Sequence, residues 1–335
     1  MPTQTVVITG ASGGVGRALA RVYGRRGANV GLLARGEAGL EAAAREVRSS
    51  GGQALVVPAD VADPDQVEAA ADRVESQLGP IHQWINNAMV TVLARTWDVT
   101  PDEFRRVTEV NYLGYVHGTL AALRRMRPRD RGTIVQVGSA LAFRGIPVQA
   151  AYCATKHAIV GFTESLYAEL LAEDSGIRLC DVHLPGLNTT QFIWGRNKLP
   201  RRPQPVPPIY RPEVAAEAIA WAAGHGRRTT YVAGSTVATI WGNRLAKGVL
   251  ARYLARTNID AQQTDRPSSP DDLDNLFEPQ DHDRDRGCYG PFTDQAHEMS
   301  PVQVVSRNRG KVVAGVAFAA MAVAALRGGH NRYPR

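Results

Sequence analysis

Cysteine is scarce in this 335-residue chain and forms no paired spacing. The three cysteines, Cys153, Cys180 and Cys288, are odd in number and far apart. Disulfide frameworks and zinc sites use even sets or close cysteine and histidine pairs. We therefore expect no disulfide framework, no metal ion and a reducing, cytoplasmic compartment. Met1–Gln4 leads directly into an apolar run, which leaves no room for a secretory signal.

The chain also lacks a strong charge of one sign. Its formal charge is +7, and the arginines are scattered rather than interleaved with aromatic residues. Nucleic-acid surfaces concentrate basic and aromatic side chains, so we expect no nucleic-acid partner. A mild basic excess fits a small anionic ligand or an anionic membrane surface.

Long hydrophobic runs are absent, with one short exception near the C-terminus. Val312–Leu326 is uncharged and is bracketed by Lys311 and Arg327. As a helix it would reach about 22 Å, short of the roughly 30 Å hydrocarbon core of a bilayer. The apolar segment 311–335 could anchor the protein to a membrane, dock on the enzyme or a partner subunit, or remain disordered.

A polar segment precedes this apolar stretch. Residues 257–310 are rich in aspartate, proline, glutamine and arginine, which predicts a flexible linker after a folded domain over 1–256. His282 stands among aspartates and arginines, and this pattern favours a solvated tract over a metal site.

The N-terminal region holds a strand, a glycine-rich turn and a helix start. The apolar run Thr5–Ile8 is followed by Thr9-Gly10-Ala11-Ser12-Gly13-Gly14-Val15-Gly16, then by a helical pattern and a second strand at Asn29–Leu33. Glycines let the backbone approach a pyrophosphate, and the helix N-terminus presents free N–H groups to it. This order predicts a dinucleotide-binding turn.

A second constellation lies near the middle of the chain. Tyr152 and Lys156 are four residues apart, which puts them on one face of a helix. Ser139 ends the apolar run Thr133–Gly138. A neighbouring ammonium favours the phenolate, so Lys156 is expected to lower the pKa of Tyr152 toward working pH. The alternation of strands and helices predicts a doubly wound parallel α/β sheet of the Rossmann type.

Together these motifs resemble the short-chain dehydrogenase/reductase family, over Thr3 to about Ser235. The family matches continue in order through the third strand, the fourth strand and beyond. The resemblance implies catalytic roles for Asn111, Ser139, Tyr152 and Lys156. It implies a cofactor site built from Gly10, Ser12, Gly13, Gly14, Val15, Gly16, Arg35, Asp60, Val61, Asn87, Ala88, Tyr152, Lys156, Pro185, Gly186 and Thr190. Met89 stands where the family usually has glycine.

Within this resemblance, Tyr152 would exchange the proton and Lys156 would also bind the nicotinamide ribose. Ser139 would orient the carbonyl, and Asn111 would hold a water that links Lys156 to solvent. The segment after Leu184 would form a substrate lid with apolar contacts from Phe192, Ile193 and Trp194.

Cofactor choice is indicated after the second strand, where Arg35 stands in place of an acidic residue. Arginine can pair with a 2′-phosphate, which predicts NADP(H), and Arg17 could add charge. We expect an NADP(H)-dependent oxidoreductase acting on a carbonyl or alcohol of a small lipophilic molecule. We also expect a homo-oligomer, a dimer or tetramer. The alternative is a non-catalytic NADP(H)-binding module on the same fold.

Overall fold

The fold is built around one parallel sheet. The computed structural model describes residues 3–308. Within them, seven strands pair in the order β10-β7-β6-β4-β1-β2-β3, and every pairing is parallel. The strands are β1 (Thr5–Thr9), β2 (Asn29–Ala34), β3 (Gln53–Pro58), β4 (Ile81–Asn86), β6 (Gly132–Ser139), β7 (Ile177–Leu184) and β10 (Thr229–Tyr231). The predicted doubly wound sheet is confirmed.

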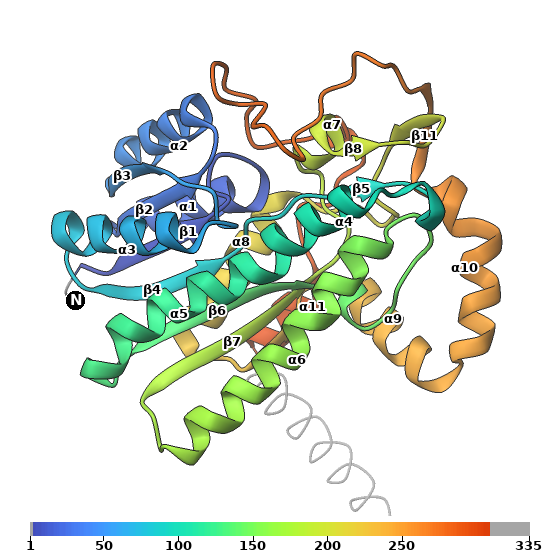
Figure 1. The fold of residues 1–335 in the computed structure, drawn as a ribbon. Helices are drawn as coiled ribbons and strands as arrows, with labels where there is room; N and C mark the ends of the chain where they lie inside the picture. Colours follow the sequence, from blue (N-terminus) through green and yellow to red (C-terminus); the bar gives the residue numbers. More distant parts are fainter. Residues whose placement is uncertain (1–2, 309–335) are drawn as a thin grey trace, which may run out of the picture.

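Helices cover both faces of this sheet (Figure 1). One face carries a buried cluster shared by α1 (Gly14–Arg25), α2 (Glu37–Ser49) and α8 (Pro212–His225). The other face carries a second cluster shared by α3 (Pro64–Leu78), α4 (Pro101–Thr108), α5 (Gly114–Met126) and α6 (Ala150–Ala172). Both faces of the strands are therefore apolar, as a sheet buried between two helix layers requires.

Local signals set several helix starts. The Asp63 side chain accepts hydrogen bonds from the backbone N–H groups of Asp65 and Gln66 and so caps α3. Thr100 and Glu103 form a reciprocal capping box at the start of α4. Each cap satisfies backbone donors that a helix start leaves unpaired, and is worth about 1 kcal/mol.

Shorter elements surround the edge where the strands end. They are β5 (Val92–Leu93), the π-helical turn η2 (Glu109–Leu113), α7 (Gln191–Trp194), β8 (Arg196–Asn197), β9 (Arg201–Pro203) and β11 (Gln263–Pro267). Short 3₁₀ turns lie at Thr96–Asp98, Arg127–Arg129, Ala140–Ala142 and Thr293–Gln295, and α11 spans Pro301–Arg307. The chain after Leu184 is rich in proline, which disfavours regular structure, yet it contains the short elements α7, β8 and β9.

The apolar spacing over Trp241–Ala255 predicts a single helix, but the structure has two there. The chain forms α9 (Gly234–Leu245) and α10 (Lys247–Ala261), and Ala246 between them has φ −143° and ψ 50°, outside the helical region. The two helices bury separate residues, Thr236 and Ile240 on α9 and Asn258 on α10.

The polar segment after α10 differs most from expectation. The sequence predicted a linker from residue 257, but that boundary falls inside α10, and β11 then pairs antiparallel with β9. Residues 268–292, named here the C-terminal strap, cross the carboxyl edge of the sheet (orange in Figure 1). Leu276 is 0% exposed in one core cluster and Cys288 is 1% exposed in the other.

Leu276 and Cys288 anchor the strap in the two core clusters, although its polar composition predicted a flexible linker. The strap also uses its polar backbone for contacts: Asn275 N–H donates to Trp194 O at 2.8 Å, and Ala38 N–H donates to His282 O at 3.0 Å. The apolar segment 311–335, with Val312–Leu326, lies outside the described residues. No helix within residues 3–308 combines the length and apolar character needed to cross a bilayer.

Candidate active site

A cavity of about 530 Å³ opens at the carboxyl edge of the sheet. It lies where the strand order reverses between β1 and β4, the switch point at which doubly wound sheets bind ligands. Most of the residues predicted for the site line it. They are Gly10, Ser12, Gly13, Gly14, Val15, Arg35, Asp60, Val61, Asn87, Ala88, Ser139, Tyr152, Lys156, Pro185, Gly186, Thr190, Phe192 and Trp194.

The glycine-rich loop makes one wall of this cavity. Gly10 and Gly14 have φ of +66° and +49°, which favour glycine. A methyl group on Gly10 would lie 2.8 Å from the Cα of Ala88, and one on Gly16 would lie 2.1 Å from the carbonyl oxygen of Gly10. Gly16 therefore serves close packing of helix on loop rather than lining the cavity. The loop and the N-terminus of α1 leave a cradle suited to a dinucleotide pyrophosphate.

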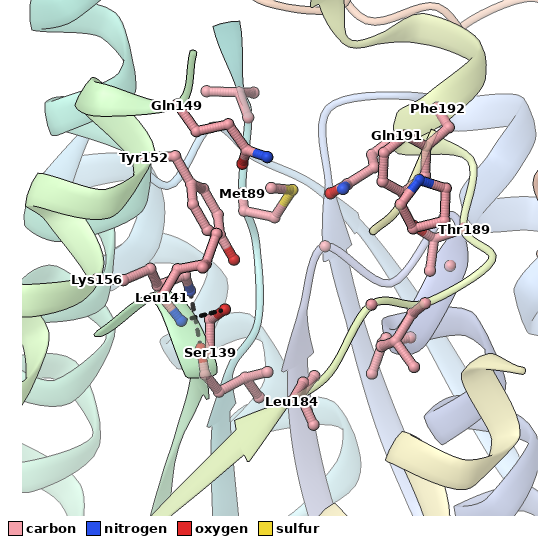
Figure 2. Close-up of a pocket in the computed structure, with 18 of the residues that line it drawn as sticks. Met89, Ser139, Leu141, Gln149, Tyr152, Lys156, Leu184, Thr189, Gln191 and Phe192 are labelled. Atoms are coloured by element: carbon pink, nitrogen blue, oxygen red, sulfur yellow. Dashed lines mark hydrogen bonds between the residues drawn. The ribbon is translucent and has the colours of Figure 1, made fainter. Parts of the chain in front are cut away.

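Ser139, Tyr152 and Lys156 meet on the opposite wall (Figure 2). Ser139 ends β6, while Tyr152 and Lys156 lie in the first two turns of α6. Lys156 Nζ lies 5.6 Å from the centre of the Tyr152 ring. Ser139 Oγ accepts a hydrogen bond from the Leu141 N–H at 3.1 Å, which fixes the serine side chain.

Burial shifts both titratable groups of this trio. Burial raises the pKa of Tyr152 to about 12, against a smaller lowering by its hydrogen bond with Ser139. Burial lowers the pKa of Lys156 to about 7. The sequence led us to expect a lowered phenol pKa, and this expectation is wrong, because desolvation of the buried phenol raises its pKa. The phenol is protonated at neutral pH and is suited to donating a proton.

Tyr115 is a neighbour that the motifs did not indicate. Lys156 Nζ donates to Tyr115 Oη at 3.0 Å and to the carbonyl oxygen of Val137 at 2.8 Å. Tyr115 Oη donates in turn to the same carbonyl at 3.0 Å. These bonds hold the ammonium beneath Tyr152. No spacing rule could have found Tyr115, because it lies on another helix, α5, 41 residues before Lys156 in the sequence.

Asn111 lies in the π-helical turn η2 and is 0% exposed. Its Oδ1 accepts from Val90 N–H at 2.8 Å, and its Nδ2 donates to Val90 O at 2.9 Å. The amide thus pins the segment after β4, and Asn111 does not line the cavity itself. A π-turn is a frequent device at functional sites, because the extra residue redirects one side chain.

The second strand and its loop form the far end of the cavity. The Asp60 carboxylate pairs with Arg106. Arg35 donates to the backbone carbonyls of Asn275, Leu276 and Phe277 in the strap. Its guanidinium is therefore engaged by the chain itself, and desolvation lowers its pKa.

Arg17, which could have added charge to the cavity, is committed elsewhere. It pairs with Glu46 and Asp285 and is 4% exposed.

Asn87 Nδ2 donates to Thr9 O at 2.9 Å, so this amide ties the loop after β4 to the end of β1.

The lid region supplies part of the expected apolar wall. Phe192 and Trp194 line the cavity, but Ile193 does not and is 37% exposed. Met89 lines it too, as Figure 2 shows. Leu250 and Leu254 line the cavity, and they belong to the apolar stretch Trp241–Ala255 that the sequence pattern assigned to the substrate cleft or to an interface. Other lining residues come from elements that sequence patterns did not connect to the site: Gln149, Asn275, Gln280 and Asp281. Only tertiary packing brings the last three to the cavity.

Comparison with known proteins identifies the family. Residues 4–198 match the family model described as short chain dehydrogenase. A Bacillus subtilis protein named uncharacterized oxidoreductase YxnA is 32% identical over 85% of this chain and 79% of its own length. Mouse dehydrogenase/reductase SDR family member 7B is 38% identical over 52% of this chain and 54% of its own length.

Solved structures agree with this assignment. A short-chain type dehydrogenase/reductase from Mycobacterium marinum matches with a TM-score of 0.61 at 26% identity, over 70% of this chain and 95% of its own. A Burkholderia phymatum protein, solved in complex with NAD, matches with a TM-score of 0.66 at 23% identity, over 80% and 98% of the two chains. The chain belongs to the short-chain dehydrogenase/reductase family of oxidoreductases, which bind a nicotinamide dinucleotide.

Proposed function

We propose that this protein transfers hydride between NADP(H) and a carbonyl or secondary alcohol of a lipophilic small molecule, with Tyr152 as the acid and base. The supporting observation is that Ser139, Tyr152 and Lys156 line the same cavity as the glycine-rich loop. When bound, the nicotinamide supplies or accepts the hydride. The family assignment disfavours the alternative of a non-catalytic module.

The chain's own residues would handle the proton. In reduction, the protonated phenol of Tyr152 donates to the carbonyl oxygen, and in oxidation its phenolate accepts the hydroxyl proton. Ser139 Oγ donates to the same oxygen and stabilises its developing charge. Lys156 lies under the phenol, held by Tyr115 and Val137, and its ammonium favours the phenolate when Tyr152 loses its proton.

Apolar side chains around these groups support a lipophilic substrate. Met89, Leu141, Phe192, Leu250 and Leu254 all line the cavity. Burying apolar substrate surface against such a wall contributes about 25 cal/mol per Å². The polar trio then fixes which carbon of the substrate faces the cofactor.

Arg35 supports NADP(H) as the preferred cofactor. It follows β2, where an arginine can accommodate the 2′-phosphate of the adenosine ribose. The carbonyls of residues 275–277 occupy its donors, so the phosphate would have to replace at least some of these bonds. An ionised acceptor makes the stronger bond, which favours the exchange.

The test is dinucleotide consumption by the purified full chain. NADPH and NADH oxidation would be followed with steroid, fatty-acyl and quinone carbonyls, and with small ketones and aldehydes. We expect turnover with an apolar carbonyl and a larger kcat/KM for NADPH than for NADH. Dinucleotide binding without turnover of any carbonyl or alcohol would favour the non-catalytic module.

A further inference from the structure

Asp281 in the C-terminal strap places a carboxylate at the far end of the cavity. Its side chain is 5% exposed and lines the cavity. It lies against the two glycines that flank the start of α2. A methyl group on Gly36 would fall 1.7 Å from Asp281 Oδ1, and one on Gly39 would fall 2.4 Å from Oδ2. The glycines therefore leave the space that this carboxylate fills.

The strap backbone holds Asp281 in this position. Gly39 N–H donates to the carbonyl oxygen of Asp281 at 3.1 Å, and Ala38 N–H donates to that of His282 at 3.0 Å. These bonds satisfy donors at the start of α2 that a helix leaves unpaired. The cap is made by main-chain carbonyls, so the Asp281 carboxylate itself is not needed for it.

The carboxylate is short of partners. Among residues 3–308, Asp281 Oδ2 is buried and has no hydrogen-bond partner. Leaving a buried acceptor without a donor is unfavourable, so this oxygen, on a side chain that lines the cavity, is available to a donor from a ligand. Arg35 could have supplied the donor, but its own donors go to the carbonyls of residues 275–277.

The position corresponds to the adenosine ribose of a dinucleotide. In doubly wound folds an acidic residue after the second strand binds the ribose 2′-hydroxyl of NAD, and an arginine there suits the 2′-phosphate of NADP. Here β2 ends at Ala34 and is followed by Arg35, with no acid in the local sequence. The C-terminal strap instead places the acidic residue Asp281 beside Gly36, directly after Arg35.

We propose that Asp281 is a specificity-determining residue that accepts a hydroxyl of the adenosine ribose and repels a 2′-phosphate. Arg35 attracts that phosphate, so the preference between the two dinucleotides is the difference between two opposing contributions. The inference rests on the proposed function only in requiring that a nicotinamide dinucleotide occupies the cavity.

The test measures dinucleotide binding rather than turnover. Dissociation constants of NADPH and NADH would be obtained for the full chain by fluorescence titration without substrate. Asp281→Asn keeps the shape and removes the charge. We expect its NADPH affinity to rise about tenfold or more relative to NADH, because like charges side by side oppose binding. Arg35→Ala should move the same ratio in the opposite direction.

Asp283→Asn is the matched control. Asp283 lies two residues away in the strap, and its side chain is 97% exposed. This variant should leave both dissociation constants unchanged. If Asp281→Asn shifts both affinities equally, or no more than Asp283→Asn does, the carboxylate does not read the ribose and the inference is overturned.

Two further outcomes separate this inference from the proposed function. Turnover by the parent with an unchanged NADPH-to-NADH ratio in Asp281→Asn overturns the inference alone. A shifted ratio in a protein that reduces no carbonyl supports the inference and contradicts the proposed function. If Asp281→Asn does not fold, Asp281→Ser with thermal shifts by NADP⁺ and NAD⁺ gives the same comparison, and an unchanged difference between the two shifts would overturn it.

Discussion

At the scale of single residues, the site depends on which side chains are desolvated together. Tyr152 and Lys156 share a cavity wall, and burial moves their pKa values apart, raising that of Tyr152 to about 12 and lowering that of Lys156 to about 7. Both shifts disfavour the charged form of each group. A resting pair with a protonated phenol is matched to reduction, in which Tyr152 gives its proton away.

Replacing Tyr152 with phenylalanine should remove the proton donor and keep the ring. General acid–base catalysis contributes about 10²–10⁴-fold, so kcat should fall by at least about 100-fold. The NADPH dissociation constant should stay within about twofold, because the hydroxyl is not proposed to bind the phosphates. Steady-state kinetics and fluorescence titration would measure the two. A Phe variant with near-parental turnover would assign the acid to another group.

The two reaction directions should differ in their dependence on pH. Oxidation needs the phenolate of Tyr152, whose pKa is about 12, so its kcat/KM should rise with pH above neutrality. The rise should be less than tenfold per pH unit, because Lys156, with a pKa of about 7, loses over the same range the ammonium that favours the phenolate. Reduction uses the protonated phenol, which is the main form below that pKa, so its kcat/KM should not fall over the same range through this group. Profiles from pH 6 to 10 would check this, and a flat oxidation profile would contradict it.

At the scale of elements, the start of α2 joins the dinucleotide cavity to the C-terminal strap. Gly36 has φ −83° and ψ 114°, which any residue adopts, so its lack of a side chain serves space rather than backbone conformation. Asp281 occupies that space. The packing of the strap therefore depends partly on Gly36, which lies about 245 residues earlier in the sequence.

Replacing Gly36 with alanine should loosen the strap and leave the sheet intact. The added methyl group would lie 1.7 Å from Asp281 Oδ1, so the strap has to move. Trypsin cleavage at the exposed Arg284 should become at least several-fold faster. Gly248→Ala in α10 is the control, because a methyl group there meets nothing within 4 Å. Equal cleavage rates in the two variants would show that the strap does not depend on Gly36.

At the scale of the whole molecule, the strap packs the C-terminal part of the chain against the N-terminal part. It connects the lid, the start of α2 and the start of α1, and Cys288 Sγ–H donates to Gly14 O at 3.1 Å. Beyond it, Ser300 Oγ donates to Val232 O at 2.6 Å beside β10. The expected domain end near residue 256 therefore cuts through packed structure.

Truncation should show that the strap stabilises the fold and that the segment after Asn308 does not. A chain ending at Asn308 should keep the parental Tm within about 2 °C and its dinucleotide binding. A chain ending at Ala255 loses the buried Leu276 and Cys288, and its free energy of unfolding should fall by on the order of 3–5 kcal/mol. Thermal and urea denaturation would measure both. Equal stability of the two chains would restore the prediction of an independent linker.

The membrane prediction concerns Val312–Leu326 alone, outside the described residues, and the chain ending at Asn308 tests it. We expect the full chain in the membrane fraction and the shortened chain in the supernatant. Both in the supernatant would contradict anchoring. Light scattering on the same two chains would test the predicted dimer or tetramer.

The sequence by itself determined the parts of this protein that rest on local spacing. The glycine-rich turn, the helical Tyr152–Lys156 pair and the strand end at Ser139 predicted the sheet and most of its cavity, because short-range geometry fixes where these residues lie. Tyr115, Asp281 and the strap contacts of Arg35 were decided only by tertiary structure. Each of these features depends on contacts between residues far apart in the sequence. The polar composition of residues 257–310 predicted a linker, because composition does not show that single residues such as Leu276 and Cys288 are buried in the core.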